Sequence, residues 1–172
     1  MHGAAEFETA RLIGRRLAAA DAAAMHAVYG HAEGMRWVGD GRPLTRERCE
    51  RWIEITQRNY AQRGYGMYAL VERASGAVIG FCGLVHPDGQ ADAEIKYALH
   101  ADAWGRGYAT EAARALLAYG RDVHGLRRVI ATAAPEHAVS HRVLLKAGLR
   151  MGALRRNDDG SSTQLFDWAG DP

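Results

Sequence analysis

Apolar side chains recur at helical spacing in the first third of the chain. The clearest case runs from Thr45 to Gln62, where apolar or uncharged side chains return every three to four residues. The side chains on this face are Cys49, Trp52, Ile53, Thr56 and Tyr60. A shorter helix is predicted after Asp21, a residue type that favours the N-cap. Its apolar face is formed by Met25, Val28 and Tyr29.

Two more helices are predicted in the second half of the chain. Residues 108–124 form an amphipathic pattern, and Gly125 ends it because glycine readily adopts the left-handed conformation of a helix C-terminus. The predicted buried side is formed by Ala109, Ala112, Leu116, Gly120 and Val123. Residues 137–147 predict a short helix that ends in the same way at Gly148.

Other segments have the alternating or continuous apolar pattern of strands. Residues 8–17 predict a first strand, and GYGMYALVERASGAVIGFCGLV predicts two strands joined by a turn at residues 74–76. The remaining predicted strands are residues 93–99, 128–133, 149–156 and 163–168. The resulting order of strands and helices predicts an α/β fold, in which a mixed sheet carries helices on both faces.

Composition narrows the class of protein. The chain has 172 residues, of which 48% are hydrophobic and 24% charged, with a formal net charge of +2, as is typical of a globular domain. The arginines are scattered, so nucleic-acid binding is not indicated, and no segment approaches the roughly 18 apolar residues of a membrane span. Cys49 and Cys82 lack metal or redox spacing, which predicts buried thiols in a reducing compartment.

Two further observations support the same picture. The N-terminal stretch MHGAAEFETARL lacks the apolar core of a signal peptide, so we expect the protein in the cytoplasm. His86, His100 and His124 lack the spacing of metal ligands, so no metal site is expected.

The stretch HADAWGRGYATEAA places Gly105 and Gly107 between a predicted strand and a predicted helix. This arrangement brings backbone N–H groups and the positive end of a helix dipole to one point, which suits an anion. A tight loop without a ligand is the alternative. A Walker loop is excluded because no lysine follows the glycines, and a dinucleotide fingerprint is disfavoured because Thr110 stands where its third glycine belongs.

The stretch AEIKYALHADAWGRGYATEAARALLAYG resembles the acyl-CoA-binding motif of the GNAT family of N-acetyltransferases, most closely its RimJ/RimL type. The motif maps onto Trp104, Gly107 and Ala109, with Trp104 in place of the usual Gln or Arg. The segments ETARLIGRRL and HAVSHRVLLKAGL are also similar to the family, so the resemblance covers nearly all of residues 8–168. It implies a single GNAT domain over residues 1–172. Its central, mostly antiparallel mixed sheet would have a V-shaped splay between two parallel strands.

The resemblance implies acetyl-CoA as the acyl donor. Backbone groups of Tyr97, Ala98 and Leu99 would pair with the pantetheine arm, and the Leu99 N–H would polarise the thioester carbonyl. The residues implied for the pyrophosphate are Gly105, Arg106, Gly107, Tyr108, Ala109 and Thr110. The short helix would add His137, in place of the family's Asn, and Ser140. A solvated loop arginine at position 106 and a purely structural Ser140 remain alternatives.

Two acid–base groups of many relatives are missing, since the family's tyrosine falls at Leu144 and its glutamate base at Thr132. A thiol has a reference pKa of about 8.5, so coenzyme A can leave as the thiolate without a dedicated acid, and a hydrogen bond from Ser140 or from water would suffice. Glu94 is the candidate general base, acting through water from the strand face that also holds Lys96. A plain salt bridge between Glu94 and Lys96 is the alternative.

The acceptor side is implied to come from the irregular segment 30–44 and from the closing hairpin. The candidate acceptor contacts are Met35, Arg36, Trp37, Asp158 and Asp159. For Trp37 a role in capping the core is the alternative, and for the two aspartates a plain solvated turn is the alternative.

These residues predict an acetyl-CoA-dependent N-acetyltransferase that acts by direct attack of a primary amine in a ternary complex. A site with few acid–base groups favours an α-amine, with a pKa of about 7.7–8.0, over a lysine with a pKa of about 10.4. The alternatives are a non-catalytic acyl-CoA-binding sensor or scaffold, and an acetyltransferase for aminoglycosides or polyamines. A homodimer is compatible with the resemblance, because relatives often pair.

Overall fold

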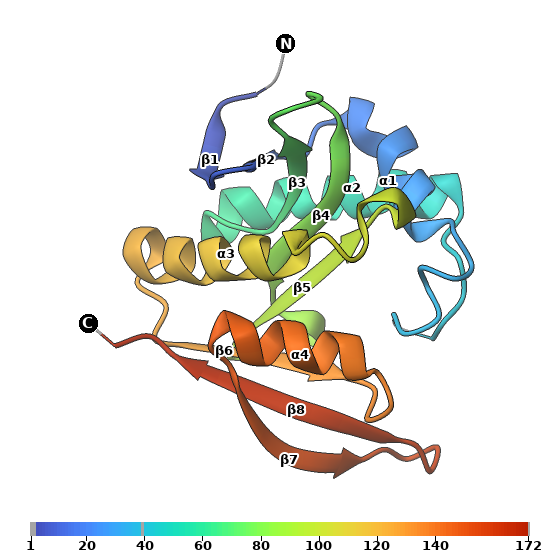
Figure 1. Cartoon of the computed structure of the whole chain (residues 1–172), viewed down its shortest axis with the longest axis vertical. Coiled ribbons are helices and arrows are strands. Elements are labelled where there is room, and N and C mark those ends of the chain that lie inside the picture. The colour runs from blue at the N-terminus through green and yellow to red at the C-terminus, as the bar shows by residue number, and fades with distance from the viewer. Residues whose placement is uncertain (1–2, 39, 172) are drawn as a thin grey trace.

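The computed structural model describes residues 3–38 and 40–171 as an eight-stranded sheet with four α-helices (Figure 1). In chain order the elements are β1 (Ala5–Glu8), β2 (Leu12–Arg16), α1 (Ala22–Tyr29), α2 (Arg46–Arg63), β3 (Met67–Glu72), β4 (Val78–Val85), β5 (Ala93–Leu99), α3 (Tyr108–His124), β6 (Arg128–Ala133), α4 (Ala138–Ala147), β7 (Arg150–Arg156) and β8 (Ser162–Ala169).

The sheet has the strand order β1-β2-β3-β4-β5-β6-β8-β7, and its neighbouring strands are antiparallel except for the parallel pair β5 and β6. Helices α3 and α4 cover one face, and α1 and α2 cover the other (Figure 1). Leu116 and Phe166 belong to the core on the first side, and Met25 and Phe81 to the core on the second. The predicted fold class, a mixed sheet with helices on both faces, is confirmed.

Strands β5 and β6 separate after a short contact. Their ladder contains the pairs Ala93–Val129 and Glu94–Ile130, whereas β5 pairs with β4 as far as Leu99. Beyond Glu94 the parallel strands diverge, so the second half of β5 has no strand partner on that side. The V-shaped splay implied by the family resemblance is therefore present.

The predicted first strand, residues 8–17, covers β2 and the tight turn before it, whereas β1 (Ala5–Glu8), which pairs with β2, was not predicted. Thr9 closes the turn, because its backbone N–H donates to the Leu12 carbonyl at 2.9 Å and its hydroxyl accepts from the Leu12 N–H at 2.9 Å. A Cβ at Gly14 would lie 2.2 Å from the Phe7 ring, so glycine is needed where β1 crosses β2. A single continuous strand was the wrong prediction, because polar turn residues interrupt it.

The predicted buried side of α3 is correct except at its end. Ala112, Leu116 and Gly120 are buried, but Val123 is 61% exposed. In the last turn of α3 it is His124 that packs against the rest of the fold, because the centroid of its ring lies 5.0 Å from that of Tyr65. Helical spacing predicts which side chains share a face, but only the tertiary structure decides where the core ends.

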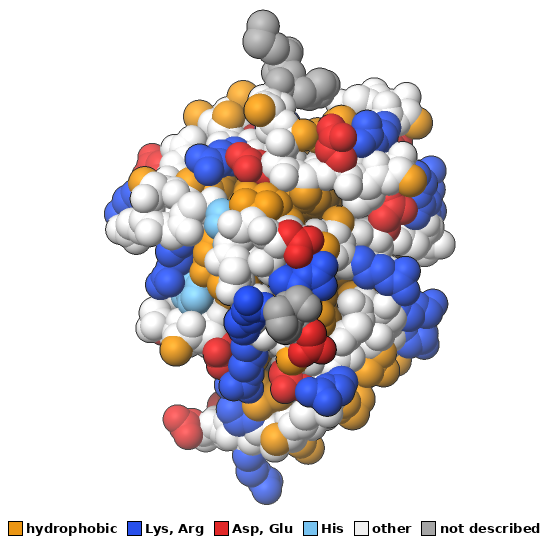
Figure 2. Space-filling view, turned by 90° about the vertical axis from the view of Figure 1, so that its left-hand side faces the viewer, with side chains coloured by type: hydrophobic (Ala, Val, Ile, Leu, Met, Phe, Trp, Pro, Cys, Tyr) orange, Lys and Arg blue, Asp and Glu red, His pale blue; other side chains and the backbone are white. Residues whose placement is uncertain are grey.

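The predicted burial of the two cysteines is confirmed. Cys49 and Cys82 are buried free thiols, and burial raises the pKa of both. None of the described helices is long and apolar enough to cross a membrane. On the face shown in Figure 2, basic and acidic side chains lie close to one another, in keeping with the small net charge.

His124 makes the stability of the fold sensitive to acid. Its Nε2 is buried and has no hydrogen-bond partner among the described residues, and burial lowers the pKa of the ring. Below the unfolded pKa of about 6.5, the unfolded chain therefore binds a proton that the folded protein does not. The free energy of unfolding should fall as the pH drops below that value.

The measurement is urea unfolding at a series of pH values for the wild type, His124→Gln and a control, His26→Gln, at an exposed position on α1. The acid loss is expected to be smaller in H124Q than in the other two proteins. Equal slopes in all three would contradict this account.

Candidate active site

Two glycines in the left-handed conformation shape the loop between β5 and α3. The φ angle is 72° at Gly105 and 81° at Gly107, values that other residues rarely adopt. Within residues 3–38 and 40–171, the N–H groups of Gly105, Arg106 and Gly107 have no hydrogen-bond acceptor. The first turn of α3 adds N–H groups without intrahelical partners. The loop therefore presents a row of free donors at the positive end of α3, which suits an anion.

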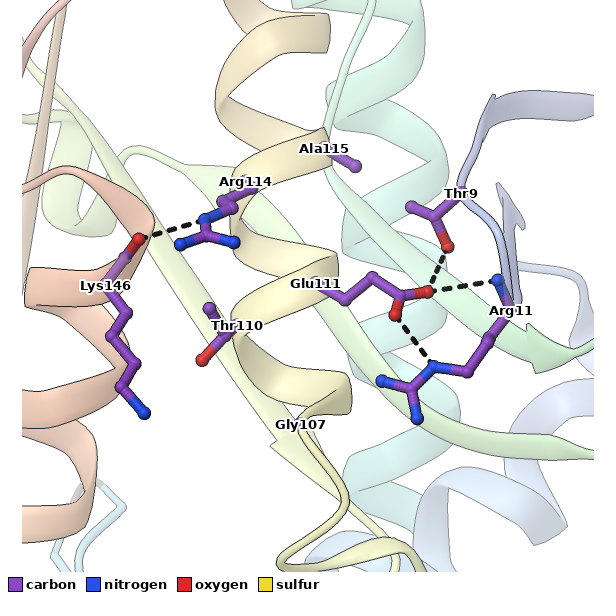
Figure 3. A pocket seen from close by; sticks show the side chains of 8 residues that line it. All are labelled: Thr9, Arg11, Gly107, Thr110, Glu111, Arg114, Ala115 and Lys146. Atoms are coloured by element: carbon purple, nitrogen blue, oxygen red, sulfur yellow. Dashed lines mark hydrogen bonds and ion pairs between the residues drawn. The ribbon is translucent and has the colours of Figure 1, made fainter.

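An open groove of about 620 Å³ adjoins the loop along α3 (Figure 3). Thr110 and Arg114 line it from α3, Lys146 from α4, and Thr9 and Arg11 from the turn between β1 and β2. The Arg114 Nε donates to the Lys146 carbonyl at 2.9 Å, which ties the two helices together. Arg114 and Lys146 were not predicted as site residues, because their proximity follows only from the packing of α3 against α4.

Alternate backbone groups of β5 face the gap beside β6. The His100 N–H donates to the Ile79 carbonyl at 2.7 Å, and orientation toward β4 alternates along the strand from there. The N–H and C=O groups of Tyr97 and Leu99 therefore face the gap, whereas those of Ala98 face β4. The implied backbone contact of Ala98 is corrected by this register, because its peptide groups point toward the neighbouring strand.

The Trp104 side chain forms a hydrogen bond with one of the backbone groups that face the gap, the Leu99 carbonyl. Its indole Nε1 donates to the Leu99 carbonyl at 2.9 Å, while the ring stays 42% exposed. The Leu99 N–H is thereby the group left free at the open end of the gap.

A pair of hydroxyls lies on the α4 side of the gap. The Tyr97 hydroxyl and the Ser140 Oγ are 2.8 Å apart, and Ser140 is 9% exposed. Burial raises the pKa of Tyr97 to about 12, and the hydrogen bond with Ser140 acts in the opposite direction. The Tyr97 hydroxyl also lies 3.5 Å from the Ser140 carbonyl, so the Ser140 hydroxyl has a proton to donate elsewhere when Tyr97 donates to its Oγ.

Glu94 lies where the parallel strands separate. It is 5% exposed, and its Oε1 accepts a hydrogen bond from the Thr132 hydroxyl at 2.7 Å. Ile95 and Ala131 pack in the core under α3 and α4, so Glu94 and Thr132 face the opposite side of the sheet. Thr132 is the position at which the resemblance implied a missing glutamate, and the Glu94 carboxylate reaches this place from the neighbouring strand.

The alternative interaction of Glu94 is present at the same time. The Lys96 Nζ is 3.7 Å from the Glu94 Oε2. The pair joins a buried carboxylate to a surface ammonium, since the Glu94 side chain is 6% exposed and that of Lys96 is 42% exposed. The Glu94 carboxylate therefore has a hydroxyl on one oxygen and an ammonium near the other.

The loop between α1 and α2 brings Trp37 onto the N-terminus of α4. The Trp37 and His137 rings are stacked, with centroids 5.1 Å apart and planes at 15°, and the Arg36 guanidinium lies 4.8 Å from the Trp37 ring. Burial lowers the pKa of His137, and His141 acts in the same direction. Met35 is 3% exposed and packs in the core with α1 and α2, so its predicted contact with an acceptor is corrected.

The remaining predicted residues are spread around these groups. Asp158 and Asp159 are exposed in the turn between β7 and β8. The Asp159 Oδ1 accepts from the Ser161 hydroxyl at 2.6 Å and from the Ser161 N–H at 2.9 Å, and these hydrogen bonds lower the pKa of Asp159. These contacts favour the solvated-turn alternative for Asp159. Tyr108 is buried and donates its hydroxyl proton to Glu72, so it offers an anion only its backbone N–H.

Comparison with known proteins identifies the class. The family model described as acetyltransferase (GNAT) domain matches residues 11–150. The uncharacterized N-acetyltransferase YoaA of Bacillus subtilis is 30% identical over 152 residues, covering 87% of this chain and 85% of that protein. The uncharacterized protein YkkB of the same organism is 34% identical over 100 residues, covering 57% of this chain, which spans only 58% of YkkB.

Solved structures give the same result. An acetyltransferase of the GNAT family from Bacillus anthracis superposes with a TM-score of 0.82 at 23% identity, covering 95% of this chain and 97% of that one. RimL, a ribosomal L7/L12 α-N-protein acetyltransferase in complex with coenzyme A, superposes with a TM-score of 0.78 at 16% identity, covering 94% and 95%. The chain belongs to the GNAT family. It is an acetyltransferase.

Proposed function

We propose that the protein acetylates a primary amine of low pKa, the α-amine of a peptide or protein, by direct attack on acetyl-CoA in a ternary complex. The observation that carries the proposal is the placement of two kinds of group about one gap. Glu94 lies on one face of the sheet, and the Tyr97–Ser140 hydroxyls lie on the other. The acceptor amine would thus face a carboxylate, and the leaving thiolate would face hydroxyl donors, at the same gap.

The free N–H groups of the glycine loop are proposed to hold the pyrophosphate of acetyl-CoA, and Thr110, Arg114 and Lys146 to line the path of its adenosine end. The pantetheine arm would enter the gap between β5 and β6 and pair with the backbone of Tyr97 and Leu99. Trp104 already binds the Leu99 carbonyl, but the Leu99 N–H has no such contact. This N–H would donate to the thioester oxygen.

The proposed reaction is a single acyl transfer. The amine nitrogen attacks the thioester carbonyl carbon, forming the C–N bond, and the C–S bond then breaks. Glu94 accepts the proton that the amine loses, through a water molecule, and the departing thiolate is stabilised by a hydrogen bond from Ser140. No covalent intermediate with the protein is required, because an amine held in line attacks a thioester readily.

The choice of acceptor rests on the pKa of the amine. A carboxylate acting through water is a weak base, which suffices for an α-amine with a pKa of about 7.7–8.0 but serves a lysine amine near 10.4 poorly. The fold similarity to RimL, named as an α-N-protein acetyltransferase, is compatible with this choice. We accordingly place the protein with the RimJ/RimL type as part of the proposal.

The test is release of free thiol from acetyl-CoA in the presence of candidate amines. Peptides with a free N-terminus are expected to be acetylated. The same lysine-containing peptides with a blocked N-terminus serve as matched controls, and they are expected to react at least about tenfold more slowly at neutral pH. A preference for the blocked peptides, for polyamines or for aminoglycosides would overturn the choice of acceptor.

The non-catalytic alternative is distinguished in the same experiment. Leu144 stands where many relatives have a tyrosine, which is the observation that favours a binding module. Such a module would be stabilised against heat by acetyl-CoA but would release no thiol with any amine tested.

A further inference from the structure

Arg11 connects the N-terminal hairpin to the glycine loop. Its Nη1 donates to the Arg106 carbonyl at 2.9 Å, although the two residues are 95 positions apart. Its Nε donates to the Glu111 Oε1 at 2.8 Å and its backbone N–H to the Oε2 at 3.1 Å, and the Thr9 hydroxyl also donates to Glu111 (Figure 3). One guanidinium thus bridges the first turn of α3 and the loop that precedes it.

The Arg106 carbonyl and the Gly107 N–H belong to the same peptide unit. In a trans peptide these two groups point in opposite directions. The hydrogen bond from Arg11 therefore also sets the direction of the Gly107 N–H, which must point away from Arg11. Because Gly105 and Gly107 have few conformational restraints of their own, this peptide would otherwise rotate easily.

The Arg11 guanidinium also contacts the start of α3, although its side chain is 43% exposed. Arg11 lies 4.1 Å from the centroid of the Tyr108 ring, and Arg106 lies 5.0 Å from it. A Cβ at Gly107 would be 3.4 Å from the Arg11 Nη2. The Tyr108 hydroxyl is in turn held by Glu72. The loop is thus held on the side that faces Arg11.

We propose that Arg11 is a positioning residue of the donor site, which keeps the Gly107 N–H directed at the pyrophosphate by holding the Arg106 carbonyl. This inference rests on the proposed function, because it requires a diphosphate at the loop. Arg11 lies outside the glycine motif, and the N-terminal hairpin becomes part of the acetyl-CoA site.

The test compares acetyl-CoA with acetyl-pantetheine, which has the same thioester arm but no diphosphate. In Arg11→Gln, the Kd for acetyl-CoA is expected to rise about tenfold, which corresponds to the loss of one charge-assisted hydrogen bond, that from the Gly107 N–H to the pyrophosphate. The Kd for acetyl-pantetheine should stay within about twofold of the wild-type value. Arg11→Lys keeps the charge but cannot serve Glu111 and Arg106 together, so it should weaken acetyl-CoA binding to a similar extent.

The matched control is Arg73→Gln. Arg73 also braces the hairpin, since its Nε donates to the Thr9 carbonyl at 2.9 Å, but it makes no hydrogen bond to the loop among the described residues. Its affinity for acetyl-CoA is expected to be that of the wild type. Thermal unfolding without ligand shows whether each variant is folded, and if R11Q is not, R11K carries the comparison.

Three results would overturn the inference: unchanged acetyl-CoA affinity in R11Q, equal weakening of both donors, or wild-type affinity in R11K, which would indicate charge alone. Failure of the wild type to bind acetyl-CoA through the loop would instead overturn the proposed function. Loss of the phosphate-dependent part of binding in both Arg11 variants, with R73Q unaffected, would support the inference.

Discussion

Replacing Glu94 with glutamine is expected to lower kcat for an α-amine acceptor by about 100-fold or more, the typical contribution of a positioned general base. The KM for acetyl-CoA should change little, because Glu94 lies on the face of the sheet away from the loop and α4. Glutamine keeps the shape of the side chain and the hydrogen bond with Thr132, so the change removes the proton acceptor and little else. Steady-state kinetics with an N-terminal peptide measure it.

The dependence on pH separates a base from a structural residue. As the pH rises above the pKa of the acceptor amine, more of the amine is already deprotonated, and the defect of E94Q should shrink. Glu50→Gln, at an exposed carboxylate on α2, is the control and should leave kcat unchanged. A uniform defect at every pH, or wild-type activity in E94Q, would exclude Glu94 as the base.

Replacing Asp21 with alanine is expected to lower the free energy of unfolding by about 3–5 kcal/mol, the usual effect of leaving a buried charge without its partner. The Arg15 Nη1 and Nη2 each donate to a different oxygen of Asp21 at 2.8 Å, and the two residues are 9% and 5% exposed. Burial alone raises the pKa of Asp21. The bonds from Arg15 and from the Ala18 N–H outweigh it and hold the pKa below its ordinary value.

Removal of both charges tests this explanation. Arg15→Met combined with Asp21→Leu removes both charges and is expected to be less destabilising than D21A alone. Asp122→Asn breaks the exposed pair with Arg121 and should leave the urea midpoint unchanged. If D21A were as stable as the wild type, or if the double variant lost more stability than D21A, the buried pair would not stabilise β2 against α1.

Much of the fold was predictable because the signals are local. Thr45 begins α2 through its hydroxyl, which accepts from the Arg48 N–H at 3.2 Å, and Gly64 ends it with a φ of 86°. A cap and a left-handed glycine depend on neighbours in sequence. The break between β1 and β2 was missed, because the turn is held in part by Glu111, a residue 100 positions from Arg11.

In the candidate site, too, local features could be predicted and long-range contacts could not. The glycine loop could be predicted from its residues alone, since positive φ and a helix start are local properties. The contacts of the side chains could not. Glu94 reaches the position of Thr132 from another strand, and Trp37 stacks on His137 from a loop about 100 positions earlier in the chain.

By itself, the sequence determined the order of strands and helices apart from β1, the glycine loop and the family resemblance, because periodicity, capping and glycine conformation act over a few residues. Only the tertiary structure decided which face of the sheet each polar group occupies, how Arg11 meets the loop and that Met35 is buried. These outcomes depend on the packing of segments far apart in the chain, whose contacts no local pattern specifies.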